Sequence, residues 1–179
     1  MDTTFNVFDV LRIAEEVERR AARFYMEAAR QFTDSFRRGI CYDLASWRIR
    51  HEQAWSRIRR DYSERTGEFG RFDPDNYVSS NPQVMAGLTW FGAGWEVRGL
   101  RLTHLTAQQI LRDALRRANE VFIFYQGLKD FACDVESRST IDHMIAEERR
   151  HIGDLNRSVD RMRARTAVPS QARSLCAAV

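Results

Sequence analysis

Glycine and proline are confined to a few places in this chain, and their distribution decides which segments can form long helices. The three prolines lie at positions 74, 82 and 169, and seven of the nine glycines fall between residues 67 and 127. Proline removes a backbone donor from a helix, and glycine destabilises a helix interior by roughly 1 kcal/mol relative to alanine. The stretches before residue 67 and after residue 105 are therefore largely free to be helical, which indicates an all-α fold.

Apolar residues recur every three or four positions in these stretches, which is the period of a helix with one buried face. In a first helix, from about residue 6 to 32, the inward positions are Val10, Ile13, Val17, Ala21, Phe24 and Ala28. In a second, from about residue 34 to 62, they are Leu44, Trp47, Trp55 and Ile58. Thr106-x-x-Gln109 has the form of a capping box and opens a third helix that reaches Phe131. A fourth helix is expected from about residue 137 to 162.

A long segment, residues 63–105, separates the second and third helices. An up-down bundle needs only a short turn here, whereas a bundle with parallel middle helices needs a long crossover. We therefore predict a four-helix bundle of two hairpins over residues 1–165, followed by a flexible tail at 166–179. Within the crossover, Ser80-Asn81-Pro82 resembles a helix start. The apolar residues 82–95 could cover the core, act as a lid or meet a partner.

Composition and charge fit one folded domain that does not bind nucleic acid. The chain has 179 residues, 44% of them hydrophobic, and a net charge of +3. Its basic residues, of which only Lys129 is a lysine, are interleaved with acids, as in EEVERRAAR. Such interleaving is typical of solvated helix faces, whereas a nucleic-acid partner requires a clustered basic stripe.

Neither a membrane segment nor a cysteine-ligated centre is expected. No apolar run approaches the roughly 20 residues that cross a bilayer, and the first residues lack the features of a secretion signal, which favours a cytoplasmic location. The three cysteines, Cys41, Cys133 and Cys176, form no Cys-x-x-Cys motif. They are interpreted as ordinary reduced thiols, and no zinc or iron-sulfur site is predicted from them.

An internal repeat relates the two halves of the chain. ARFYMEAARQF around Tyr25 resembles FIFYQGLKDF around Tyr125, and His51 follows Tyr25 at the same distance as His151 follows Tyr125. Each corresponding pair is offset by one hundred residues. Two hairpins related in this way would form a pseudo-two-fold bundle with both histidines at equivalent depths.

Glu148-x-x-His151 completes a pattern that resembles the rubrerythrin-like branch of the ferritin-like superfamily over about residues 8–160, apart from the crossover. A spacing of three places both side chains on one helix face. The resemblance implies a four-helix bundle that holds two iron or manganese ions for oxygen or peroxide chemistry. It implies one Glu ligand from each of the first and third helices and a Glu-x-x-His from each of the second and fourth.

The resemblance carries over to only part of the implied ligand set. Four positions match: Glu18, His51, Glu148 and His151. Two positions depart, because Arg48 and Ala118 stand where the pattern has Glu. An always-protonated guanidinium would repel a divalent cation and could instead donate hydrogen bonds to Glu18 and Glu148. We therefore predict that a buried polar network replaces the dinuclear centre, with Tyr25 and Tyr125 as core aromatics whose hydroxyls bond to it.

Two hypotheses follow for function. In one, the protein is a pseudo-enzyme that uses the bundle for association or for binding an apolar ligand. In the other, it is an atypical oxidoreductase or iron-handling protein that keeps one iron, manganese or zinc ion on the remaining ligands. A two-metal centre is not expected. The chain lacks the four-cysteine iron domain of full-length rubrerythrins, so redox turnover would need an external electron donor. By analogy with other ferritin-like bundles, a homodimer is expected.

Overall fold

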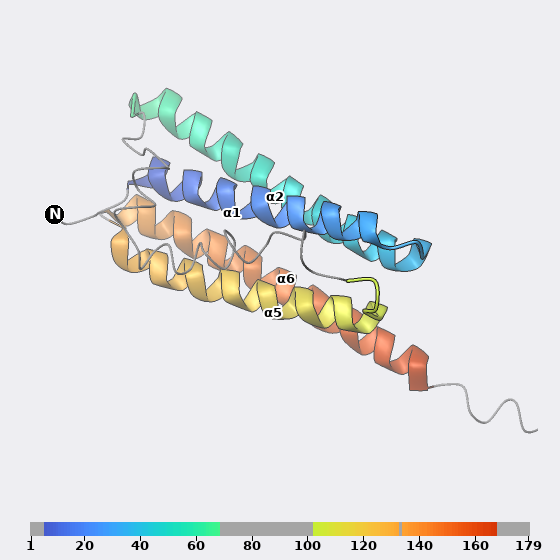
Figure 1. Cartoon of the computed structure of the whole chain (residues 1–179). Coiled ribbons are helices and arrows are strands. Elements are labelled where there is room, and N and C mark those ends of the chain that lie inside the picture. Colours follow the sequence, from blue (N-terminus) through green and yellow to red (C-terminus); the bar gives the residue numbers. More distant parts are fainter. Residues whose placement is uncertain (1–5, 69–101, 133, 168–179) are drawn as a thin grey trace, which may run out of the picture.

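A computed structural model of the chain describes residues 6–68, 102–132 and 134–167, and every regular element in these ranges is a helix (Figure 1). The α-helices are α1 (Val7–Gln31), α2 (Ser35–Thr66), α5 (Ala107–Leu128) and α6 (Val135–Ala167). A short 3-10 helix, η2 (Lys129–Phe131), follows α5. The all-α fold class predicted from the sequence is confirmed for the described residues.

The first hairpin is bounded by local capping signals. Asn6 accepts a hydrogen bond from the backbone N–H of Asp9 at 3.0 Å, and Asp34 accepts one from Arg37 at 2.8 Å. These caps satisfy donors that have no partner in the first turn of a helix. Helix α2 ends at Gly67, whose φ of 70° lies in the left-handed region that glycine adopts without steric cost.

The second hairpin begins with the predicted capping box. The backbone N–H of Gln109 donates to the Thr106 hydroxyl at 3.2 Å, and the backbone N–H of Thr106 donates to the Gln109 side chain at 2.8 Å. At the start of α6, Asp134 accepts a hydrogen bond from the backbone N–H of Ser137 at 2.6 Å. The starts of α5 and α6 are therefore fixed by short polar capping motifs, of which the one at α5 was predicted from the sequence.

The helices pair as two hairpins, α1 with α2 and α5 with α6, and the hairpins pack together through α1 with α6 and α2 with α5. Figure 1 shows α2 and α5 running in the same direction, which is the parallel arrangement of middle helices predicted from the long crossover. Helices α1 and α5 correspond in the internal repeat and run in opposite directions. This is the relation that a two-fold axis between the hairpins would produce.

The core is one apolar cluster to which all four helices contribute. All six inward positions predicted for α1 are buried. On α2, Leu44 and Trp55 are buried as predicted, but Ile58 is 38% exposed and Trp47 is only half-buried. The prediction for Ile58 was wrong because this residue lies at the margin of the buried face of α2, to which Trp55 and Tyr62 on either side of it belong.

Two helices extend beyond the predicted ends. Helix α2 continues to Thr66, because Gly67 is the first strong stop signal, so residues 63–66 are helical and do not belong to the crossover. Helix α6 runs from Val135 to Ala167 and includes the first residues that were assigned to the tail. The Ser80 helix start, the apolar segment 82–95 and the tail beyond residue 167 lie outside the described residues.

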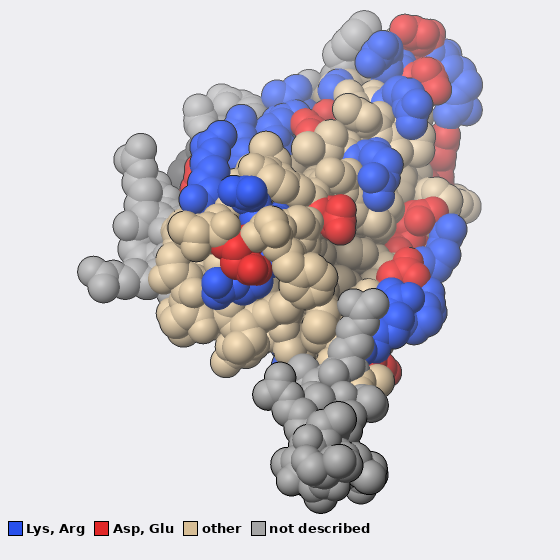
Figure 2. Space-filling model, turned by 90° about the vertical axis from the view of Figure 1, so that its right-hand side faces the viewer, with Lys and Arg blue, Asp and Glu red and all other residues tan. Residues whose placement is uncertain are grey.

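Many surface charges are paired within one helix. On α1, Arg20 Nε lies 2.6 Å from Glu16 Oε1. On α5, Arg116 Nη2 lies 2.7 Å from Asp113 Oδ1. Figure 2 shows basic and acidic side chains next to one another on the displayed face. This is the mixed pattern expected of solvated helix faces. None of the described helices is long and apolar enough to cross a membrane.

Candidate functional site

Three charged side chains from three helices lie in the centre of the bundle. Glu18 is on α1, Arg48 on α2 and Glu148 on α6, and each is only 1% exposed. Burying a charge is costly unless the charge is paired and hydrogen-bonded. The stability of this centre therefore depends on how the three groups bond to one another.

The Arg48 guanidinium bonds to both carboxylates. Its Nη1 donates to Glu18 Oε2 at 3.1 Å and to Glu148 Oε2 at 3.2 Å, while its Nη2 donates to Glu148 Oε1 at 3.0 Å. The two bonds to Glu148 form the forked geometry that guanidinium and carboxylate groups favour. Both hydrogen-bonded ion pairs predicted for Arg48 from the sequence are confirmed, and they tie α1, α2 and α6 together.

The charges in this network do not balance when both carboxylates are ionised. Burial raises the pKa of Glu18 to about 7, a change that Arg48 opposes and Glu148 reinforces. Burial also raises the pKa of Glu148, again against the effect of Arg48. Burial lowers the pKa of Arg48, but the charges of Glu148 and Glu18 outweigh it and hold this pKa above its usual value. The two carboxylates therefore titrate as a pair that binds its first proton near neutral pH.

Helix α5 contributes no charge to this centre. Ala118, where the ferritin-like pattern has Glu, is completely buried, and Tyr125 is 1% exposed. The charges of Glu18 and Glu148 reinforce burial in raising the pKa of Tyr125. Its hydroxyl interacts with the Glu18 carboxylate, which lowers the pKa of Glu18 and raises that of Tyr125, although the contact does not meet standard hydrogen-bond geometry. Tyr25 is also buried, and its ring packs edge-on against Phe24 at 5.3 Å between centroids.

The two histidines contact Trp47, a residue that the sequence predicted only as part of the core. The indole is stacked on the His51 ring at 3.8 Å and on the His151 ring at 3.6 Å between centroids, with planes inclined by 22° and 16°. The Arg48 guanidinium lies 4.8 Å from the centre of the same indole. The signal that could have pointed to Trp47 is its position one helical turn before His51.

Both imidazoles are held in the neutral state. Burial and, to a smaller extent, the neighbouring charges of Arg48 and Arg50 together lower the pKa of His51 to about 4. Burial lowers the pKa of His151 to about 2, with further contributions from Arg48 and His51. These histidines therefore add no positive charge to the network at neutral pH.

The ring contacts continue toward the surface of the bundle. His51 meets the buried Trp55 edge-on at 6.0 Å, and Trp55 meets His143 edge-on at 5.8 Å between centroids. The His143 side chain is 57% exposed. Over this part of their length, α2 and α6 are joined by aromatic and imidazole rings.

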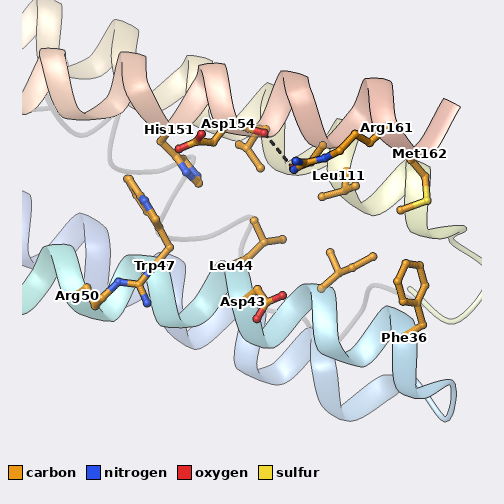
Figure 3. Close-up of a pocket in the computed structure, with 13 residues that line it drawn as sticks. Phe36, Asp43, Leu44, Trp47, Arg50, Leu111, His151, Asp154, Arg161 and Met162 are labelled. Atoms are coloured by element: carbon orange, nitrogen blue, oxygen red, sulfur yellow. Dashed lines mark hydrogen bonds between the residues drawn. The ribbon is translucent and has the colours of Figure 1, made fainter. Parts of the chain in front are cut away.

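On the other side of Trp47, α2 and α6 border an open groove of about 370 Å³ (Figure 3). The apolar residues that line it are Phe36, Ile40, Leu44, Leu111, Leu155 and Met162. Figure 3 shows Trp47 extending from α2 toward His151 on α6 at one end of the groove. Charged side chains of both signs, including Asp43 and Arg161, lie along its walls. The groove is thus apolar in the middle and closed at one end by the Trp47 stack.

The arrangement does not fit the pair of metal ions that the ferritin-like pattern implies. Three of the four central carboxylate oxygens accept hydrogen bonds from Arg48, whose fixed positive charge repels a divalent cation. The third helix supplies Ala118 in place of a ligand. Within the described residues, no group of three or more His, Cys, Asp or Glu side chains is arranged to hold a metal ion.

Comparison with known proteins found no matching family model, no similar curated protein and no similar solved structure. The resemblance to ferritin-like proteins rests on the motif residues, and what it implies about function is therefore argued from the site itself.

Proposed function

We propose that this chain is a ferritin-like bundle of the rubrerythrin type in which a buried ion network stands in place of the dinuclear metal centre. On this proposal the protein is a binding and association protein, and it is not a metal-dependent oxidoreductase. The observation that carries the proposal is the Arg48 guanidinium, which bonds to Glu18 and Glu148 at 3.0 to 3.2 Å in the middle of the bundle.

The charge of Arg48 supports this proposal more strongly than the number of missing ligands does. A guanidinium cannot be deprotonated in a protein, so it competes permanently with any cation for the same carboxylate oxygens. Removing it from the site would leave Glu18 and Glu148 buried without a counter-charge. The polar centre therefore has a structural task, which is to hold three helices in register.

The alternative is a single metal ion held by Glu148 and His151, with or without Glu18 and His51. Such a site would require Arg48 to leave its three hydrogen bonds and reach solvent, although its side chain is only 2% exposed. This rearrangement counts against an oxidoreductase or an iron-handling protein.

The groove between α2 and α6 supports binding of a small apolar molecule. Its volume of about 370 Å³ falls in the range of small-molecule sites, which is roughly 300–1,000 Å³, and its six apolar lining residues come from three helices. By analogy with other ferritin-like bundles, two copies of the chain are also expected to associate as a homodimer.

Metal content tests the first part of the proposal. Tag-free protein is expressed with iron and manganese supplied, and the metal bound per chain is measured by plasma mass spectrometry. We expect a value near zero. About two ions per chain would contradict the proposal and make a peroxide-reduction assay the next step. About one ion per chain would favour the single-metal alternative.

Probe binding tests the second part. The fluorescence of anilinonaphthalene sulfonate, an aromatic probe that carries one sulfonate group, is titrated with wild-type protein, Phe36→Ala and Tyr42→Ala. Both substitutions shorten an exposed aromatic residue of α2, but only Phe36 lines the groove. We expect several-fold weaker binding for Phe36→Ala and unchanged binding for Tyr42→Ala. Equal effects of both substitutions would contradict binding in the groove.

A further inference from the structure

Trp47 separates the two histidines that the ferritin-like pattern uses as ligands. Its indole centroid lies 3.8 Å from the His51 ring and 3.6 Å from the His151 ring, and the planes are nearly parallel. Two imidazoles cannot both lie this close to one indole centroid on the same face, because their atoms would overlap. The two imidazoles therefore occupy opposite faces of the indole.

This stack is incompatible with a close pair of metal ions. An imidazole binds a metal through a nitrogen lone pair in the plane of its ring, so it coordinates through its edge. The His51 and His151 rings are separated by close to the sum of the two centroid distances, with the indole between them. That separation is nearly twice the roughly 3.5–4 Å between the ions of a two-metal site. Parallel imidazoles this far apart cannot direct their edges to ions at that spacing.

The position of Trp47 does not depend on Arg48 alone. The guanidinium lies 4.8 Å from the centre of the indole, but both imidazole stacks are formed by other residues. His51 is one turn further along α2, and His151 is on α6. Replacing Arg48 would remove one contact and leave the indole between the imidazoles.

We infer that Trp47 is a second barrier to a dinuclear metal centre, independent of the two missing carboxylate ligands. The inference rests on the proposed function and adds a positioning residue that the ligand pattern does not contain. It follows from this inference that the Arg48→Glu and Ala118→Glu substitutions supply the two missing carboxylates but do not restore binding of two metal ions. Binding of two ions also requires removal of the Trp47 indole.

The test uses wild-type protein, the Arg48→Glu/Ala118→Glu double variant, and two triple variants that add Trp47→Ala or Trp47→Phe. Each is titrated with Mn²⁺, and both the number of ions bound and the electron paramagnetic resonance spectrum are recorded. We expect no ion for the wild type and no more than about one for the double variant. For the Trp47→Ala triple variant we expect about two ions with the spectrum of an exchange-coupled pair. Trp47→Phe keeps a stacking ring and should behave as the double variant does.

Three other results would each overturn either the role of Trp47 or the proposed function. An exchange-coupled pair in the double variant would overturn the role of Trp47 while leaving the proposed function intact. A folded Trp47→Ala triple variant that binds no more Mn²⁺ than the double variant would overturn it too. Two ions in the wild type would overturn the proposed function itself. Circular dichroism verifies folding, and if the Trp47→Ala variant does not fold, Trp47→Leu, which keeps more of the volume, replaces it with the same expectations.

Discussion

At the scale of single residues, the centre of this bundle is governed by one guanidinium and two carboxylates. Arg48 stabilises Glu18 and Glu148 because no other cation among the described residues forms an ion pair with either. A buried ion pair adds less to stability than its contacts suggest, because desolvation opposes the Coulombic attraction. Loss of one partner, in contrast, strongly destabilises the folded state, since it leaves the remaining charge buried and uncompensated.

Arg48→Met should therefore destabilise the protein more than a change of similar size elsewhere in the core. We expect a loss of roughly 3–5 kcal/mol in the free energy of unfolding at pH 8, the usual cost of breaking a buried pair. Adding Glu18→Gln and Glu148→Gln should recover part of this loss, because it removes the unpaired charges. Urea unfolding of the single and triple variants measures both effects. A triple variant less stable than Arg48→Met would contradict the account.

The pKa of Glu18 gives a dependence of stability on pH with a defined sign. This pKa is about 7 in the folded chain and 4.5 in a model carboxyl, so between these values the folded state binds more protons than the unfolded state. The contribution to stability is fully present below pH 4.5 and is lost as the pH rises through 7. The stability of wild type relative to Glu18→Gln should thus fall over this range, by on the order of 3 kcal/mol.

Urea unfolding of both proteins at several pH values between 4.5 and 8 measures this difference. His51 and His151 act in the opposite direction, because their lowered pKa values make the folded state bind fewer protons than the unfolded state. Both proteins contain these histidines, so their effect cancels in the comparison. A difference that grows with pH would contradict the assignment of the raised pKa to Glu18.

At the scale of elements, the bounds of the helices are set by a few polar residues. The capping box at Thr106 and Gln109 starts α5 immediately after a connection of which most lies outside the described residues. Helix α5 buries Ala118 and Tyr125 against the central network. The cap therefore helps to position the apolar wall of the site.

Thr106→Ala should reduce the free energy of unfolding by about 1 kcal/mol, because it removes a side-chain acceptor for the Gln109 backbone. Thr103→Ala is the matched control, since Thr103 is also exposed but precedes the helix. Its effect should stay within about 0.5 kcal/mol. Thermal and urea unfolding measure both variants, and equal losses would show that the cap contributes nothing specific.

The sequence predicted much of this element structure and of the ion network. Helical periodicity, the capping box and the sparse glycines located the four helices, and the departure at Arg48 predicted its bonds to Glu18 and Glu148. The stacking of Trp47 could not be predicted, because it depends on the distance between α2 and α6, which lie far apart in the sequence. Ile58 was misjudged for a related reason: periodicity gives the direction of a side chain and not whether a neighbouring helix covers it.

At the scale of the whole molecule, two hairpins related by the internal repeat meet around an asymmetric centre. The repeat pairs Glu18 with Ala118 and Arg48 with Glu148, so equivalent positions carry unlike groups. The observed arrangement of the hairpins brings the Arg48 guanidinium to both carboxylates. The asymmetry therefore favours one register of the bundle, in which charge complementarity is added to apolar burial.

If the centre binds no metal, the thermal stability of the whole bundle should not respond to metal ions. A ligand that binds only the folded state raises the free energy of unfolding by about 2.7 kcal/mol at one hundred times its Kd. We expect the Tm of the wild type to be unchanged in Mn²⁺, Zn²⁺ or, without oxygen, Fe²⁺. Calorimetry measures this directly. A rise in Tm that increases with metal concentration would identify binding to the folded state.

The most direct measurement of the central claim is nitrogen-15 nuclear magnetic resonance of the arginine side chains. Two ion pairs should prevent rotation of the buried Arg48 guanidinium and slow the exchange of its protons with water. We predict one arginine with resolved, slowly exchanging Nη–H signals near neutral pH, and we expect these signals to be absent from the spectrum of Arg48→Lys. If the Arg48 signals are averaged and exchange as fast as those of exposed arginines, the guanidinium does not hold the two carboxylates and the account is wrong.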